Sequence, residues 1–310
     1  MTALICGSFA FDTIMVFPDR FKNHILPEQV HILNVSFLVP QMRREFGGCA
    51  GNIAYNLKLL GGDGKPMGTV GHDFGVYRDW MDACSISLDY VKQVDEVYTA
   101  QAYITTDLDD NQITAFHPGA MNYAHLNKVP ANAGITIGIV APDGRDGMLQ
   151  HAEQLAQADI QFIFDPGQGI PMFSGHDLLR FIEQASWLAL NDYESRLMQE
   201  RTGLSLEQLA QRVRAVIVTR GGEGSSVYTD GRCIEIPVAP VPAPKDPTGC
   251  GDAYRAGLLY GLMRDMDWET TGRVAALLGA IKIAHHGTQN HRFTQAEFRA
   301  RFKEAFGYDF

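Results

Sequence analysis

The chain has 310 residues, of which 45% are hydrophobic and 20% charged, a composition typical of a globular protein with a large core. Its net charge of −10 argues against nucleic acid as a main partner, because binding a phosphate backbone requires a basic face. The five cysteines are scattered, odd in number and without a CxxC pair, which favours reduced thiols. Neither a secretion signal nor a run of ~18 apolar residues is present, so we expect a soluble, cytoplasmic protein.

A short apolar run at residues 4–8 predicts a first buried strand that ends in small residues at a ligand-facing edge. Ser8 is the last of these residues, and Asp12 follows just beyond, where it could bind the hydroxyls of a ligand or lie in solvent. Prolines then interrupt extended stretches such as residues 30–33 and 35–39. We interpret these stretches as strands outside the main fold, in a flap or an oligomer contact.

A glycine-rich segment at residues 47–52 is followed by apolar residues at helical spacing, which predicts a loop that enters a helix. Asn52, in the first turn, could cap that helix or bind a ligand. A strand is expected at residues 66–71 and a helix at 74–84. Residues 99–106 and 112–116 predict a hairpin around a polar turn, which could pair with the earlier extended stretch in a small separate sheet.

Beyond residue 130 the pattern alternates regularly between strand and helix. Strands are expected at 135–140, 160–164, 187–190 and 216–219, and helices at 148–158 and 178–184. This alternation predicts a parallel sheet with both faces covered, whose ligand crevice lies beyond the carboxyl ends of the strands. Polar clusters follow the expected strand ends at 8–12, 165–168, 191–194 and 219–224. Their common placement favours a functional site at that edge.

The stretch from Asp246 to Asp252 leads directly into another helical pattern. Gly249 and Gly251 let the backbone approach a bound group, and the first-turn amides attract anions because they lack intrahelical partners. Asp252 either caps the helix or takes a proton from a group that attacks a phosphate. Cys250 either fills space or carries a thiol of lowered pKa. The strand-end clusters favour a phosphoryl-transfer centre here.

Three other kinds of site are disfavoured by the sequence. The Gly-Lys pair near Lys65 is not a Walker loop because Pro66 replaces the required hydroxyl residue, and no Gly-x-Gly-x-x-Gly follows the first strand. His285, His286 and His291 have no standard zinc spacing and no nearby cysteine. These patterns argue against a P-loop enzyme, a dinucleotide dehydrogenase and a zinc site.

Four motifs, at residues 47–52, 191–194, 219–224 and 246–252, occur in the order found in ribokinase-like (PfkB) carbohydrate and nucleoside kinases. The chain resembles this family over nearly its whole length. The resemblance implies an α/β fold with a three-layer α/β/α core, a mostly parallel sheet and a small β-sheet lid. It implies a single kinase domain over 1–310, with the lid formed by about 13–46 and 97–118. It also implies ATP and Mg²⁺ as cofactors and leaves a requirement for K⁺ open.

Segments at residues 7–12, 17–21, 26–28, 36–39 and 116–121 are similar to a bacterial branch of adenosine and purine-nucleoside kinases. The similarity implies phosphorylation of the 5′-hydroxyl of a purine ribonucleoside, and a lid that also forms a homodimer contact. It implies that the nucleoside is bound by Ser8, Asp12, Gly48, Asn52, Phe116 and Gln168. It implies that ATP is bound by Asn191, Glu194, Thr219, Gly222 and Gly224, with Glu194 organising Mg²⁺ through water. Asp252 would be the catalytic base, and the amides of Gly249, Cys250 and Gly251 would stabilise the phosphoryl oxygens.

The chain departs from that branch around the expected base pocket. Ala102 replaces a second stacking aromatic residue, and Gly169 and Met172 replace polar or basic residues. A pocket altered in this way could accept inosine or guanosine beside adenosine. Two alternatives stay open: a ribokinase- or fructokinase-type sugar kinase of the same family, and a catalytically silent nucleoside-binding protein.

Overall fold

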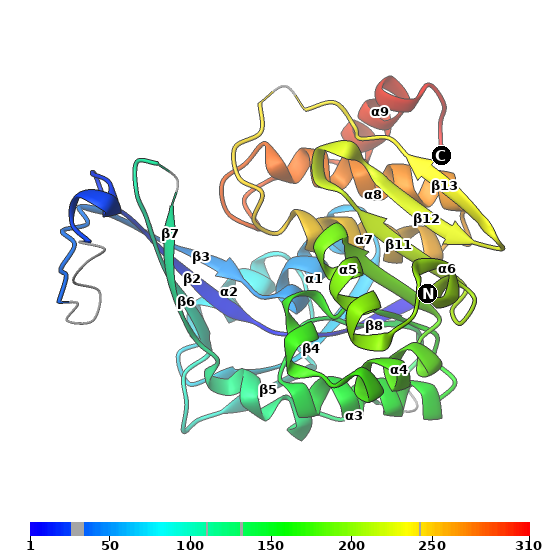
Figure 1. The fold of residues 1–310 in the computed structure, drawn as a ribbon, viewed down its shortest axis with the longest axis horizontal. Helices are drawn as coiled ribbons and strands as arrows, with labels where there is room; N and C mark the ends of the chain where they lie inside the picture. Colours follow the sequence, from blue (N-terminus) through cyan, green and yellow to red (C-terminus); the bar gives the residue numbers. More distant parts are fainter. Residues whose placement is uncertain (26–33, 110, 131–132, 242) are drawn as a thin grey trace.

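The computed structural model describes residues 1–25, 34–109, 111–130, 133–241 and 243–310. In these residues a nine-stranded sheet forms the core, and a separate four-stranded sheet projects from one side of it (Figure 1). The strand predicted at residues 30–33 lies outside the described residues, as does Asp110 in the predicted hairpin turn. Within the described ranges no helix is long and apolar enough to cross a membrane.

The large sheet is parallel from β5 to β11 and ends in an antiparallel hairpin. In spatial order its strands are β13 (Arg232–Ile236), β12 (Ser225–Thr229), β11 (Ala215–Thr219), β10 (Trp187–Asn191), β9 (Phe162–Phe164), β8 (Ile135–Val140), β1 (Thr2–Cys6), β4 (Asp63–Gly71) and β5 (Tyr90–Val94).

Helices cover both faces of this sheet, because successive side chains of each strand enter different cores. On β1, Ile5 belongs to one hydrophobic cluster, whereas Leu4 and Cys6 belong to the other. The first cluster is covered by α1 (Cys49–Leu59), α2 (Gly75–Ala83), α7 (Cys250–Leu262), α8 (Trp268–Ile283) and α9 (Gln295–Phe306). The second is covered by α3 (Arg145–Gln157), α4 (Gly175–Gln184), α5 (Asp192–Thr202) and α6 (Leu206–Ala210). The predicted three-layer α/β/α core is therefore confirmed.

The small sheet has the strand order β3-β2-β6-β7. Its strands are β3 (Gln41–Gly47), β2 (Ala10–Val16), β6 (Ala100–Thr106) and β7 (Gln112–His117). The predicted hairpin is confirmed as β6 and β7, and β6 pairs in parallel with β2.

The strand predicted at residues 35–39 is wrong, since this segment contains no strand. Its apolar side chains have a different function in the fold. The ring of Phe37 packs against those of Phe17 and Phe21, with centroids 4.8 and 5.1 Å away. The apolar run therefore builds an aromatic cluster beside the small sheet.

Candidate active site

The start of α7 is shaped by Gly249, which precedes the helix in the left-handed conformation (φ 77°). A Cβ at this position would approach the side chain of Thr288 to 2.9 Å, so glycine is required for both conformation and space. The amides of Gly249 and Gly251 donate to no acceptor among the described residues, whereas the amide of Cys250 donates to the Pro247 carbonyl at 3.1 Å. Two of the three amides predicted to bind a phosphoryl group are thus available for an anion.

Asp252 lies in the first turn of α7, where Asn52 of α1 donates a hydrogen bond from Nδ2 to its Oδ2 at 2.8 Å. Burial raises the pKa of Asp252 to about 6; the bond from Asn52 opposes this rise and the Asp165 carboxylate adds to it. A carboxylate with such a pKa is ionised at neutral pH and accepts a proton more readily than an exposed one. The geometry therefore suits a general base.

Asn52 is held in a chain of hydrogen bonds, and it does not cap its helix. Its Oδ1 accepts from Gln289 Nε2 at 2.9 Å, and Gln289 Oε1 accepts from Trp80 Nε1 at 2.8 Å. The other end of the same amide points to Asp252, so Asn52 orients the carboxylate. Gln289 was not singled out from the sequence, because it lies in a segment after α8 without a recognisable motif.

On the small sheet, Asp12, Ala102 and Phe116 lie opposite one another on three neighbouring strands. Residues paired in this way project from the same face of a sheet, and Phe116 is 52% exposed there. Burial raises the pKa of Asp12 to about 6, and the nearby carboxylates of Glu45 and Asp246 contribute to the rise. The acid and the aromatic ring predicted to hold one ligand therefore face the same side.

Glycines and Ser8 shape the loop between β3 and α1. A Cβ at Gly47 would lie 2.5 Å from Asp12 Oδ2, so the absent side chain makes room for that carboxylate. Gly48 has φ 85°, and a Cβ there would lie 2.5 Å from the Ser8 carbonyl. Ser8 also accepts a hydrogen bond from the Cys49 amide, at 3.4 Å to its Oγ. Ser8, Gly48 and Asp12 are thus neighbours, as expected for a shared ligand.

Residues predicted to bind ATP lie at the ends of β10 and β11. Asn191 pairs with Thr219 across these strands. Asn191 Oδ1 accepts from the Glu194 amide at 2.7 Å, and Glu194 Oε2 accepts from the Asn191 amide at 2.8 Å. Gly222 lies in a short turn with open space around it, and Gly224 (φ 87°) would place a Cβ 2.3 Å from the Ile236 carbonyl. The polar motifs therefore form one edge of the core.

A buried arginine connects this edge with α7. Arg255 Nη2 lies 3.0 Å from Asp165 Oδ1 and 4.0 Å from Glu194 Oε2, and the three side chains are 5%, 7% and 11% exposed. Burial raises the pKa of Glu194, the Asp165 charge adds to the rise, and Arg255 opposes it. Sequence patterns gave no role to Arg255; its one signal was a charged residue within an otherwise apolar helical stripe.

No cluster of three or more His, Cys, Asp or Glu side chains fit to hold a metal occurs among the residues that the structure describes. Both Glu194 oxygens are engaged by Asn191, at 2.8 Å to its amide and 2.9 Å to its Nδ2. Mg²⁺ commonly keeps most of its waters and binds through one or two carboxylates and substrate phosphates. The residues present therefore fit an ion that arrives with ATP and meets Glu194 through water.

Two predicted features are less well supported by the geometry. Gln168 is exposed in a short 3-10 segment, Gly167–Met172. No hydrogen bond within the described structure connects its side chain with Phe116. Burial raises the pKa of Cys250 to about 11, which opposes the thiolate that a helix N-terminus favours. The alternative that Cys250 fills space agrees better with its surroundings.

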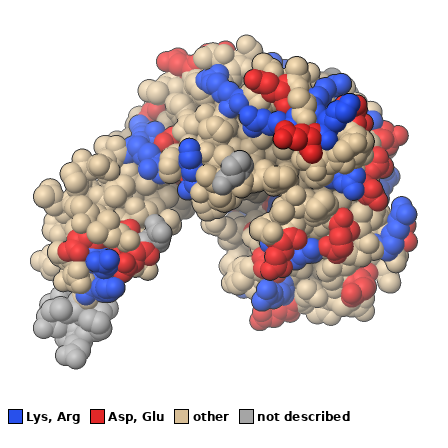
Figure 2. All heavy atoms as spheres, turned by 90° about the horizontal axis from the view of Figure 1, so that it is seen from above, with Lys and Arg blue, Asp and Glu red and all other residues tan. Residues whose placement is uncertain are grey.

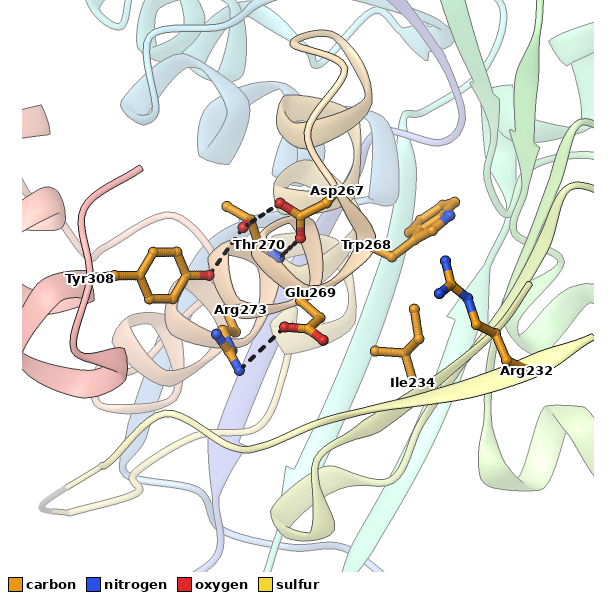
Figure 3. Close-up of a pocket in the computed structure, with 8 residues that line it drawn as sticks. All are labelled: Arg232, Ile234, Asp267, Trp268, Glu269, Thr270, Arg273 and Tyr308. Atoms are coloured by element: carbon orange, nitrogen blue, oxygen red, sulfur yellow. Dashed lines mark hydrogen bonds and ion pairs between the residues drawn. The ribbon is translucent and has the colours of Figure 1, made fainter. Parts of the chain in front are cut away.

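Figure 2 shows an open hollow between the small sheet and the core. A cavity of about 650 Å³ lies elsewhere, at the opposite end of α8, and is lined by residues such as Arg232, Trp268, Arg273 and Tyr308 (Figure 3). None of the residues predicted for the site lines this cavity.

The sequence of residues 10–295 matches the model of the pfkB family carbohydrate kinases. The chain belongs to the pfkB family. The prediction of an ATP-dependent kinase is thereby confirmed at the level of the family.

Relatives of this pfkB kinase include a nucleoside kinase of Methanocaldococcus jannaschii, 34% identical over 261 residues that cover 83% of this chain and 85% of the relative. Among solved structures, Burkholderia thailandensis nucleoside kinase in complex with inosine is 54% identical, with a TM-score of 0.91 and 99% of each chain covered. Ribokinase from Thermotoga maritima, 19% identical with a TM-score of 0.80, shares the fold and covers 97% of this chain and 99% of its own. The predicted ribokinase-like fold is confirmed.

Proposed function

We propose that this kinase transfers the γ-phosphoryl group of ATP to the 5′-hydroxyl of a purine ribonucleoside. The observation that carries the proposal is the chemistry of two groups, one on the core and one on the small sheet. A carboxylate of raised pKa, Asp252, stands at the anion-binding start of α7, and an exposed aromatic ring, Phe116, faces the same side as Asp12. The similarity to nucleoside kinases, one of them solved with inosine, supports a nucleoside as the acceptor.

In this mechanism Asp252 accepts the proton of the 5′-hydroxyl as its oxygen attacks the γ-phosphorus. Asn52 holds the carboxylate in place, and the free amides of Gly249 and Gly251 stabilise charge on the transferred group. Asn191, Thr219, Gly222 and Gly224 line the ATP phosphates. Glu194 would hold Mg²⁺ through water, and the ion would supply charge neutralisation at the phosphates.

The ribose would lie between Asp12 and Asn52, near Ser8 and Gly48, with the base over Phe116 and within reach of Gln168. Asp12 and Phe116 are separated by two strand spacings, about 10 Å, which suits a sugar at one end and a base at the other. Ala102, a small residue, lies between them on the same face. We infer that adenosine, inosine and guanosine are all accepted.

The small sheet is proposed to act as a lid, formed by about 13–46 and 97–118 of one kinase domain. Its closure would exclude water and so prevent hydrolysis of ATP. Apolar side chains are exposed on its other face, among them Met42 at 70% and Ile113 at 44%, and a second copy of the chain in a homodimer could cover them. We also propose that the protein acts in the cytoplasm, in the salvage of purines.

The test is release of ADP in the presence of adenosine, inosine, guanosine, uridine, ribose or fructose. Fastest turnover with the purine ribonucleosides, and none with 5′-deoxyadenosine, would support the proposal. Preference for ribose or fructose would favour the sugar-kinase alternative. Protection from thermal unfolding by nucleosides without any ADP release would favour the silent binding protein.

The rate should depend on pH through the base. Because the pKa of Asp252 is raised to about 6, the ionised form is lost as the pH falls through that value, and kcat/KM should decrease about tenfold per unit below it. Asp12 titrates in the same range, so an Asp12→Asn variant separates the two groups. Its acid limb should persist, although its KM rises. An acid limb that disappears in Asp12→Asn would assign the dependence to Asp12.

Replacing Phe116 by Ala should raise the KM for adenosine about fivefold to 150-fold, because stacking of a base on an aromatic ring contributes about 1–3 kcal/mol. The KM for ATP should change little. Ile113 is a matched control, since it lies on the same strand, is 44% exposed and projects from the opposite face. Equal changes in Phe116→Ala and Ile113→Ala, measured by initial rates, would contradict the assignment of the base to Phe116.

A further inference from the structure

Lys282 is a charged residue without exposed surface, near the end of α8. Its Nζ donates to the Asp246 carbonyl at 2.7 Å and to the His285 carbonyl at 3.3 Å. Burial lowers the pKa of Lys282, and the neighbouring Cys250, Asp246, Asp252 and Glu45 oppose this change. The ammonium is therefore a cation held by backbone carbonyl oxygens within an acidic part of the protein.

These two carbonyls belong to different segments, which Lys282 joins. Asp246 opens the loop that leads to Gly249 and the start of α7, whereas His285 lies in the segment that follows α8. Other bonds join the same segments: the Asp246 amide donates to the Ile283 carbonyl at 3.1 Å, and Asp246 Oδ2 accepts from the Gly287 amide at 2.9 Å. The ammonium thus binds carbonyl oxygens at the point where the loop that leads to the Gly249 and Gly251 amides is fixed.

The segment after α8 also contacts the rest of the site. Thr288 lies against Gly249 and donates to the Phe46 carbonyl of β3, and Gln289 holds Asn52. Asn290 donates to Glu45 Oε2 at 2.8 Å. A group that fixes this segment against Asp246 therefore positions the anion-binding loop, the Asn52 amide and the edge of the small sheet together.

We propose that the Lys282 ammonium is a built-in cation that holds the 246–249 loop in its active geometry and makes a bound monovalent ion such as K⁺ unnecessary. A carbonyl cradle of this kind suits a monovalent cation, but here it is filled by a side chain of the protein itself. The residues present do not fit an additional K⁺ at this place. Lys282 is a positioning residue, since it acts on the reaction through Asp246. The inference rests on the proposed kinase reaction for its kinetic part only.

The first experiment uses the unaltered protein. Its thermal unfolding midpoint and its ADP release are measured at constant ionic strength with K⁺, Na⁺ or a bulky organic cation. Equal midpoints and equal rates in the three salts are expected. A midpoint or a rate raised specifically by K⁺ would overturn the proposal, and the unfolding measurement decides even if no nucleoside is turned over.

The second experiment compares Lys282→Ala, which leaves space for an ion, with Lys282→Met, which fills the same space without charge. Loss of two charge-assisted hydrogen bonds should lower kcat about tenfold or more in both variants. In Lys282→Ala alone, K⁺ or NH₄⁺ should raise both the unfolding midpoint and kcat. Retention of kcat by Lys282→Met would overturn the proposal. Lys303→Ala, an exposed lysine of α9 paired with Asp309, is the control and should match the parent protein.

Discussion

Replacing Asp252 by Asn is expected to lower kcat by ~10²–10⁴-fold, the usual contribution of a positioned general base. Folding should be retained, because the Asn side chain has the same shape and can keep the contact with Asn52. Removal of a charge that burial disfavours also costs no stability. The measurement is a single-turnover rate at saturating ATP and adenosine, together with the unfolding midpoint.

The simpler alternative for Asp252 predicts a different result. If its carboxylate only complements the helix dipole, Asp252→Asn should keep full turnover and lose about 0.3–1 kcal/mol of stability. Asp192 provides the matched control, because it is also an acid in the first turn of a helix, and its side chain is 55% exposed. Asp192→Asn should leave kcat unchanged. More than a tenth of the parent turnover in Asp252→Asn would exclude the role of base.

The regular part of the fold was predictable because its strands are short, apolar and separated by helical patterns. The segments expected at 135–140, 187–190 and 216–219 correspond to β8, β10 and β11. Strands β5, β12 and β13 were not predicted. In β13 four of the five residues are partly or fully exposed, and edge strands of this kind lack a continuous apolar run.

The candidate site was predictable only where function depends on backbone shape or on motif residues. Gly48, Gly224 and Gly249 have positive φ. Such positions favour glycine, which can be recognised in the sequence. Lys282 and Gln289 were missed, because their importance depends on contacts with Asp246 and Asn52 that are distant in the sequence. A single sequence shows that a residue is charged or polar, but it does not show which distant residue contacts it in the folded chain.

Replacing Arg255 by Met should destabilise the protein by about 3–5 kcal/mol, the usual cost of removing one partner from a buried ion pair. The Asp165 and Glu194 carboxylates would lose the cation that lies 3.0 and 4.0 Å from them, and both would remain buried. Urea unfolding measures the change. Arg196→Met is the matched control, since Arg196 pairs with Asp192 on the surface, with side chains 78% and 55% exposed, and should cost less than about 1 kcal/mol.

A double variant separates the loss of charge balance from the loss of packing. If stranded carboxylates cause the instability of Arg255→Met, then Asp165→Asn added to it should restore part of the lost stability, because one buried charge is removed. If the loss reflects packing of the long side chain, the two substitutions should add. Activity gives a second distinction. Without Arg255 the pKa of Glu194 should rise, so Glu194 should take up a proton more readily. The double variant should therefore recover stability but not the rate of the parent protein.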